Sequence, residues 1–461
     1  MNLELHHPFL RILFKILIVL FVSSCATLNP KTIPLESTFL NPQGPQGSLV
    51  KAIPLFVKPS GEWGSLMYWA SPSFLSARFN PKILLDAGYD QWRAQRREGL
   101  EDVQGIKVVF KTYLVPGGIP DLQSGLLLLP AADRTGVKKL TWVIWTKGTD
   151  LERKNAPSNF AGSETTFAAL LASLGYAVWM PDYVGFGESE GVQTYCVPDS
   201  QALSACDGLI AARQVLSGLQ AYYQESGRLS ITGYSQGGQA AMASAKYLSE
   251  NSQLFPGLSL NTVYSLSAPL DLMIGAGPEA PTQSILSRPE YTYYLVLGWS
   301  RAYPQIKPAE LLKSEVLKKV GPLFDGTRDN EVLRNALAQA VGKSSDQITY
   351  EDIFTPEYLE GIKIAPESIP YYTQQKASRL DRWVPGNGTK IVLAASLKDV
   401  VVNSQNSLNA RDYILSTNPG AQVSFQELYS DTHASAGGEA LLYSIIKIDQ
   451  EEQSYESHDY P

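Results

Sequence analysis

The chain has 461 residues, a length that suggests two to three domain-sized units. Hydrophobic residues make up 44% of it and charged residues 18%, as is ordinary for a chain that buries a core. The formal net charge of −7 offers no basic surface for nucleic acid, so nucleic acid is set aside as a partner.

Residues 1–24 have the layout of a bacterial signal peptide. Arg11 and Lys15 flank and interrupt an apolar run over residues 9–22, and small residues follow it before Cys25. The run is too short and too interrupted to predict a membrane-spanning helix.

Cys25 ends a segment, residues 22–25, that resembles the bacterial lipobox. In proteins with this motif the cysteine becomes the first mature residue and carries lipid, and each buried CH₂ contributes about 0.8 kcal/mol to membrane binding. The resemblance implies a lipid anchor in the bacterial cell envelope, and the absence of Asp at position 26 favours the periplasmic side of the outer membrane. An ordinary signal peptide with an incidental cysteine is the alternative.

Cys196 and Cys206 are the two cysteines left if Cys25 is lipidated. An oxidising compartment would allow them to form a disulfide. Two free thiols are an equal alternative, because the sequence does not give their geometry.

Residues 25–60 are rich in Pro, Gly, Asn and Ser, which predicts a tether between the lipid and the fold. Residues 61–100 are interpreted as an N-terminal extension packed on the body. From about residue 105 strands alternate with helices, which predicts an α/β fold with parallel strands covered by helices on both faces. The predicted strands are 106–115, 124–129, 140–145, 176–180, 229–232, 262–266, 390–395 and 423–428, and the predicted helices are 165–174, 200–223, 236–248, 407–415 and 439–446.

The alternation stops over residues 271–385, where mainly helical patterns are interrupted by Pro and Gly. A helical insertion between strands of one sheet is a cap. The α/β core, with its extension, is then assigned to residues 61–270 and 386–450. Residues 451–461 are a polar tail, which we expect to be disordered.

Ser235 is the candidate nucleophile. It lies at the centre of Gly-Tyr-Ser-Gln-Gly, residues 233–237, between a predicted strand and a predicted helix. A serine that attacks a carbonyl needs such a sharp turn to lift its Oγ clear of the sheet, and side chains at the flanking glycines would collide there. The pattern is weak alone and becomes specific in this strand-to-helix context.

His433 is the candidate general base, because a serine hydroxyl needs a group that takes its proton. Of the four histidines, His6 and His7 lie in the signal segment and His458 lies in the polar tail. His433 remains, and it follows the last predicted strand directly.

Asp399 is the candidate carboxylate that fixes the tautomer of the base and stabilises its imidazolium form. It follows the predicted strand 390–395 at the carboxyl end, where such sheets collect their ligand groups. Asp431 is the rival. Lying only two residues from His433, it is poorly placed to reach the ring, and a turn role is its alternative.

Two donors are needed for the oxyanion that forms during attack. The backbone N–H of Gln236 is expected to be one. The second is expected from the loop after strand 140–145, where Thr149 offers its N–H and its hydroxyl. An ordinary glycine turn is the alternative for this loop.

These motifs resemble the α/β-hydrolase superfamily and, within it, the secretory lipase group of bacteria and fungi. The resemblance covers about residues 105–450 and rests on Gly148-Thr149, on the segment 176–189, on the Ser235 turn, and on Asp399 and His433. It implies an α/β-hydrolase fold, a mostly parallel sheet covered by helices, with the cap inserted between late strands. The family often has His-Gly in the oxyanion loop, where this chain has Lys147-Gly148.

By the same resemblance the cap gates an acyl pocket, and its aromatic residues would line that pocket. A core of the cap itself is an equal alternative role for these side chains. They are Tyr291, Tyr293, Tyr294 and Trp299.

The leading hypothesis is a serine hydrolase that cleaves small-molecule or lipid esters through an acyl-enzyme, with no metal or organic cofactor. The sequence has no His-Glu-x-x-His motif, no cysteine pair at zinc spacing and no phosphate-binding glycine loop. A serine peptidase of the same fold and a non-catalytic lipid-anchored binding protein stay open as alternatives. The sequence does not give the oligomeric state.

Overall fold

The computed structural model describes residues 44–60, 80–96, 100–132, 136–274, 278 and 283–459. The predicted signal peptide and the lipobox at Cys25 lie outside these residues. Among the helices of the described part, none combines the length and the hydrophobicity needed to cross a membrane.

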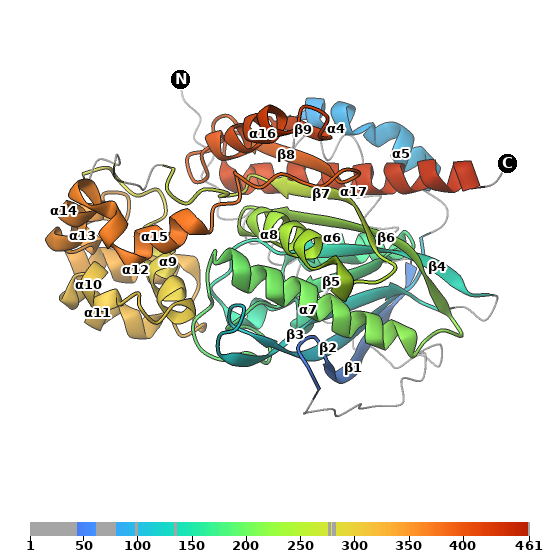
Figure 1. Cartoon of the computed structure of the whole chain (residues 1–461), viewed down its shortest axis with the longest axis horizontal. Helices are drawn as coiled ribbons and strands as arrows, with labels where there is room; N and C mark the ends of the chain where they lie inside the picture. Colours follow the sequence, from blue (N-terminus) through green and yellow to red (C-terminus); the bar gives the residue numbers. More distant parts are fainter. Residues whose placement is uncertain are drawn as a thin grey trace, which may run out of the picture.

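One nine-stranded sheet organises the body, in the order β1-β2-β3-β5-β4-β6-β7-β8-β9 (Figure 1). The pairs β1–β2, β2–β3 and β3–β5 are antiparallel, and every later pair is parallel. The strands are β1 Leu49–Lys58, β2 Val103–Tyr113, β3 Pro120–Pro130, β4 Lys138–Thr146, β5 Ala177–Pro181, β6 Tyr223–Tyr234, β7 Ser259–Leu266, β8 Lys390–Ser396 and β9 Val423–Leu428. Because parallel strands need long crossovers, helices cover both faces of the sheet.

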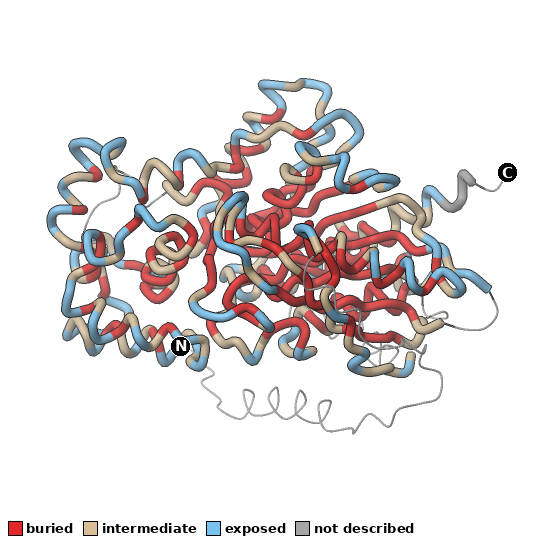
Figure 2. The backbone as a smooth tube through the Cα atoms, turned by 60° about the horizontal axis from the view of Figure 1, so that its bottom comes forward, coloured by how far each residue is buried: buried red, intermediate tan, exposed pale blue. Residues whose placement is uncertain are grey.

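The covering helices form two layers with separate apolar cores. The helices of the body are α4 Pro81–Ala87, α5 Tyr89–Arg96, α6 Ser163–Ser173, α7 Pro198–Ser217, α8 Gln236–Glu250, α16 Gln405–Thr417 and α17 His433–Asp459. Helices α7, α8 and α16 pack on one face of the sheet, and α4, α5, α6 and α17 pack on the other. Buried residues concentrate in the central strands (Figure 2). The α/β-hydrolase architecture expected from the sequence is confirmed.

In the described residues between β7 and β8, seven α-helices group together at one end of the sheet (Figure 1). They are α9 Pro289–Ala302, α10 Pro308–Leu311, α11 Ser314–Val320, α12 Asn330–Val341, α13 Tyr350–Ile353, α14 Pro356–Ile364 and α15 Pro370–Ala377. They share an apolar cluster in which Tyr293 and Trp299 are fully buried and Tyr294 is nearly so. These three side chains therefore help to form the cap's own core.

Two predictions at the ends of the chain are wrong. The strand β1 occupies part of the predicted tether, residues 25–60, and pairs antiparallel with β2 at the edge of the sheet, where Pro54 is tolerated. The predicted disordered tail, residues 451–461, continues α17 as far as Asp459. Its Glu452 pairs with Arg228 at the sheet. In both places a partner distant in sequence orders a segment of polar or Pro-rich composition.

The possible disulfide between Cys196 and Cys206 is absent, and both cysteines are buried free thiols. Cys206 lies about 12 Å along α7 from the start of that helix and packs in the core of the sheet. Cys196 lies in the loop before α7 and belongs to the core of the cap. The two thiols therefore belong to different apolar clusters and are not bonded to each other.

Asp207 of α7 is 1% exposed and accepts hydrogen bonds from Thr112 of β2 and from Gln46. Burial raises the pKa of this carboxyl to about 6. The fold therefore favours the protonated form, so its contribution to stability is fully present below pH 4 and is lost as the pH rises through 6.

Replacing Asp207 with Asn removes this titration. We expect the free energy of unfolding of the Asp207→Asn variant, relative to the parent, to rise between pH 4 and pH 7. The shift of about two pKa units corresponds to on the order of 3 kcal/mol. Urea unfolding at several pH values measures it, with the exposed Asp90→Asn as the control. Parallel pH profiles for the parent and Asp207→Asn would contradict the assignment.

Candidate active site

Ser235 lies between the last residue of β6 and the first residue of α8, with φ +58° and ψ −122°. Its N–H donates to the carbonyl of Leu266 in β7, at 2.8 Å. A Cβ added to Gly233 would lie 2.4 Å from the carbonyl carbon of Gly237, and one added to Gly237 would lie 2.1 Å from the carbonyl oxygen of Thr146. The turn therefore requires glycine at both flanking positions, as the sequence pattern indicates.

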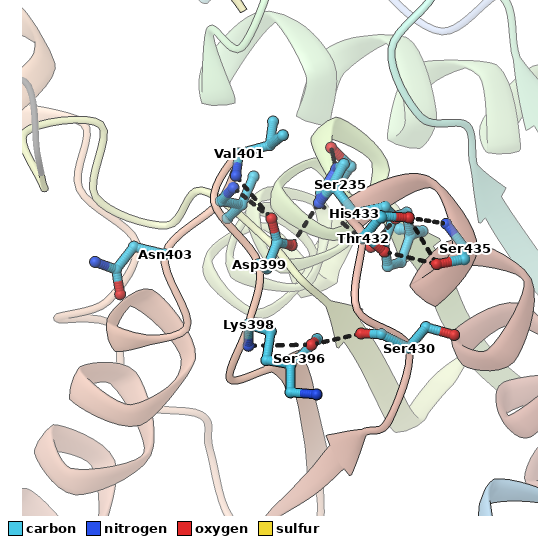
Figure 3. Close-up of polar contacts among 12 residues, drawn as sticks. Ser235, Ser396, Lys398, Asp399, Val401, Asn403, Ser430, Thr432, His433 and Ser435 are labelled. Atoms are coloured by element: carbon cyan, nitrogen blue, oxygen red, sulfur yellow. Dashed lines mark hydrogen bonds and ion pairs between the residues drawn. The ribbon is translucent and has the colours of Figure 1, made fainter. Parts of the chain in front are cut away.

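His433 is the first residue of α17 and lies across the carboxyl edge of the sheet from Ser235 (Figure 3). Its Nε2 is 2.8 Å from Ser235 Oγ. The side chain of His433 is 15% exposed, and the hydroxyl of Tyr234 donates to the backbone carbonyl of His433 at 2.6 Å. The imidazole is thus in hydrogen-bond contact with Ser235 Oγ and remains partly open to solvent.

Asp399 follows β8, and its Oδ2 lies 2.5 Å from His433 Nδ1 (Figure 3). Its side chain is fully buried. The other carboxylate oxygen accepts the backbone N–H groups of Val401 and Val402, at 2.8 and 3.0 Å. These two bonds fix one carboxylate oxygen on the backbone that follows Asp399, so the other oxygen faces the imidazole ring.

Asp431, the rival carboxylate, points elsewhere. It pairs with Lys398 at 2.6 Å, and both side chains are more than 70% exposed. The structure therefore brings Asp399, and not Asp431, to His433.

Glu439 holds the loop before His433, a role that the sequence analysis missed. This fully buried carboxylate of α17 accepts the N–H groups of Tyr429 and Ser430, the hydroxyl of Ser430 and the N–H of Asn80. The hydroxyl of Ser396, at the end of β8, donates to the carbonyl of Ser430 at 2.8 Å and so joins the loops of Asp399 and His433 (Figure 3). A glutamate within the apolar stretch of α17 was the available sequence signal.

The loop after β4 lies directly on the Ser235 turn. Thr146 Oγ1 donates to the carbonyls of Thr232 and Gly237, at 3.0 and 2.7 Å. The N–H of Gly148 donates to Glu164 of α6 at 2.9 Å. Burial raises the pKa of the Glu164 carboxyl. Because the Gly148 N–H already donates to Glu164, it is not free to bind a ligand.

Thr149 and Gln236 are the two expected oxyanion donors. Gln236 is the first residue of α8, and its N–H is one of those that a helix start leaves without an intrahelical acceptor. The hydroxyl of Thr149 is 2.9 Å from the hydroxyl of Tyr195, so that group already has a partner. The backbone N–H of Thr149 is then the group of this residue that could meet an oxyanion.

Lys147 stands where the family often has histidine. Its side chain is 9% exposed and donates to the carbonyl of Asn155 at 3.2 Å. Its ammonium also lies 4.9 Å from the centre of the Phe186 ring. These contacts hold the Lys147 side chain against the turn that follows the loop after β4.

Within the described residues, no group of three or more His, Cys, Asp or Glu side chains is placed to hold a metal ion. The arrangement instead supplies a hydroxyl, an imidazole and a carboxylate in one line of hydrogen bonds, next to a helix N-terminus.

Residues 154–263 match the model of the secretory lipase family. A comparison of the sequence with curated proteins finds no match.

Several solved structures share the fold. The rice cell wall degrading esterase LipA from Xanthomonas oryzae is 21% identical, with a TM-score of 0.68, covering 88% of this chain and 98% of the esterase. A putative hydrolase from Legionella pneumophila is 20% identical, with a TM-score of 0.66 over 87% of this chain and 97% of that one. Lipase A from Candida antarctica, in its closed state, is 14% identical, with a TM-score of 0.52 over 89% and 83%.

The TM-scores establish the likeness of the fold, and the family match covers the segment that contains the Ser235 turn. The chain therefore has the α/β-hydrolase fold and matches the secretory lipase family over residues 154–263.

Proposed function

We propose that this chain is a serine esterase that cleaves carboxylic esters through an acyl-enzyme on Ser235. The observation that carries the proposal is the continuous hydrogen-bonded line from Ser235 Oγ to His433 and on to Asp399, at 2.8 and 2.5 Å. An imidazole so oriented is able to take the hydroxyl proton as the serine attacks.

In the first half of the reaction, Ser235 Oγ attacks the ester carbonyl carbon and His433 accepts the hydroxyl proton. Asp399 keeps Nδ1 protonated and stabilises the imidazolium ion. The tetrahedral intermediate places its negative charge on the former carbonyl oxygen, to which the N–H groups of Gln236 and Thr149 donate. His433 then gives its proton to the leaving alcohol, and the acyl group stays on Ser235.

In the second half, water attacks the acyl carbonyl and His433 takes its proton. The same donors stabilise the second tetrahedral intermediate. Its collapse releases the carboxylic acid and returns the proton to Ser235. Atoms and charge balance over the cycle, which consumes one ester and one water and releases an alcohol and a carboxylic acid.

Esters are favoured over peptides because residues 154–263 match the secretory lipase family. The same three side chains are chemically able to cleave amides, so a peptidase remains the second candidate. The complete hydrogen-bonded line argues against a non-catalytic binding protein.

The secretory lipase match also supports export of the chain. We further infer a lipid anchor at Cys25, on the strength of the segment 22–25 and the apolar run before it. The anchored enzyme would act on small-molecule or lipid esters in the cell envelope, on the periplasmic side of the outer membrane.

The direct test is hydrolysis of p-nitrophenyl butyrate by the full chain in mild detergent, beside its Ser235→Ala variant. We expect the variant to lose nearly all turnover and to keep no more than about 10³-fold acceleration over water. Ser249→Ala, which changes an exposed serine on the same helix, serves as the control and should be as active as the parent. A fluorophosphonate should label the parent and not Ser235→Ala. Retained turnover in Ser235→Ala would rule out this nucleophile.

The backbone strain at Ser235 predicts a difference between two inactive variants. An L-residue at positive φ costs about 1–2 kcal/mol, whereas glycine avoids this cost and loses roughly 0.5–1 kcal/mol in chain entropy. Because Ser235 has φ +58°, we expect Ser235→Gly to be more stable than Ser235→Ala, by about 1 kcal/mol. Chemical unfolding of the two variants measures the difference. Equal stabilities would mean that the turn relaxes without strain.

The anchor predicts a change in partitioning. After carbonate extraction of cell membranes, we expect the parent chain in the pellet and Cys25→Ser in the soluble fraction, because the lipid is attached through the cysteine sulfur. Ala26→Ser, which keeps Cys25, should remain in the pellet. Membrane retention of Cys25→Ser would refute the lipid attachment.

A further inference from the structure

Tyr195 connects the candidate oxyanion loop with the cap. It lies in the loop between β5 and α7 and is 5% exposed. Its hydroxyl is 2.9 Å from the hydroxyl of Thr149. Burial raises the pKa of the Tyr195 hydroxyl far above its usual value. The contact with Thr149 is therefore one between two neutral groups at any pH at which an esterase is assayed.

On its other side, Tyr195 contacts cap helix α9 closely. Its ring stacks on Tyr294, with the ring centres 5.0 Å apart and 29° between the planes. A Cβ added to Gly298 would lie only 2.4 Å from the backbone nitrogen of Tyr195. The guanidinium of Arg301 donates to the carbonyl of Val192 in the same loop. Helix α9 is therefore seated against the backbone that carries Tyr195.

The loop that follows Thr149 meets the cap a second time. The N–H of Arg153 donates to the carbonyl of Gly326 at 2.8 Å, and the guanidinium of Arg153 donates to the carbonyl of Ser189. On the side of the body, Glu164 holds Gly148. Thr149 thus lies between Gly148, which the body holds, and Arg153, which the cap holds. Tyr195 contacts the Thr149 side chain directly.

We propose that Tyr195 is a positioning residue through which cap helix α9 sets the place of the Thr149 N–H in the oxyanion site. This inference rests on the proposed function. Tyr195 does not itself touch the reacting atoms. It restrains the Thr149 side chain, and the backbone N–H of Thr149 moves with that side chain.

Such a role has a definite kinetic signature. Oxyanion donors act on charge that develops in the transition state, so a misplaced donor lowers kcat and leaves KM nearly unchanged. A defect in packing, by contrast, lowers the melting temperature and affects substrate binding as well.

Tyr195→Phe separates the two roles, because phenylalanine keeps the ring and its stacking and loses only the hydroxyl. With p-nitrophenyl butyrate and the full chain, we expect kcat to fall about tenfold, less than the roughly 10²- to 10³-fold loss on removal of a whole oxyanion donor. KM and the melting temperature should stay close to those of the parent.

A double-mutant cycle with Thr149→Val tests the route of the effect. If Tyr195 acts through the Thr149 hydroxyl, then the double variant loses no more kcat than Thr149→Val alone. The control is Tyr303→Phe, because Tyr303 directly follows α9 and its hydroxyl donates to Asp199 of α7 at 3.3 Å, away from the loop of Thr149. It should keep the kcat of the parent.

An unchanged kcat in Tyr195→Phe, or additive losses in the cycle, would overturn the inference. So would an equal loss in Tyr303→Phe, because that loss would come from general loosening of the cap. These outcomes are separate from failure of the proposed function, which Ser235→Ala and fluorophosphonate labelling report independently.

Discussion

The close approach of two backbones, at Gly237 in the first turn of α8 and at Thr146 at the end of β4, is the constraint on which the site depends. Side chains are excluded between them, and the Thr146 hydroxyl bridges the gap to the Gly237 carbonyl. This single contact holds Ser235 in a half-buried turn with positive φ and places the start of the Thr149 loop beside it. The positions of the proposed nucleophile and of the proposed oxyanion donors thus depend on the same backbone contact.

The rest of the site follows from parallel strands. Strands β6, β8 and β9 run in the same direction and end at the same edge, so the residues after them meet there although they are nearly 200 positions apart in the chain. For this reason the sequence was sufficient to predict Ser235, Asp399 and His433 as neighbours. The alternation of strands and helices indicated which edge of the sheet collects these residues, and the scarcity of histidine left His433 as the candidate base.

The remaining features depend on partners that no local pattern reveals. The strand β1 carries a proline and follows a Pro-rich stretch, and only its pairing with β2 makes it a strand. Polar residues at the end of α17 stay helical because ion pairs with the sheet hold them. Glu439 and Tyr195 belong to no motif, and their roles appear only when the loops that they join are seen side by side. Likewise, only the structure shows that Cys206 packs in the core of the sheet and Cys196 in the core of the cap.

The position of His433 as the first residue of the last helix has a consequence for timing. Helix α17 extends roughly 40 Å from His433 along the sheet and follows β9, the last strand in the order of the chain. A chain still being synthesised therefore carries Ser235 in its turn before the imidazole is present. The hydrogen-bonded line from Ser235 to Asp399 closes only after β9 has formed and α17 has docked. The order of elements along the chain thus brings His433 to the serine as one of the later steps of folding.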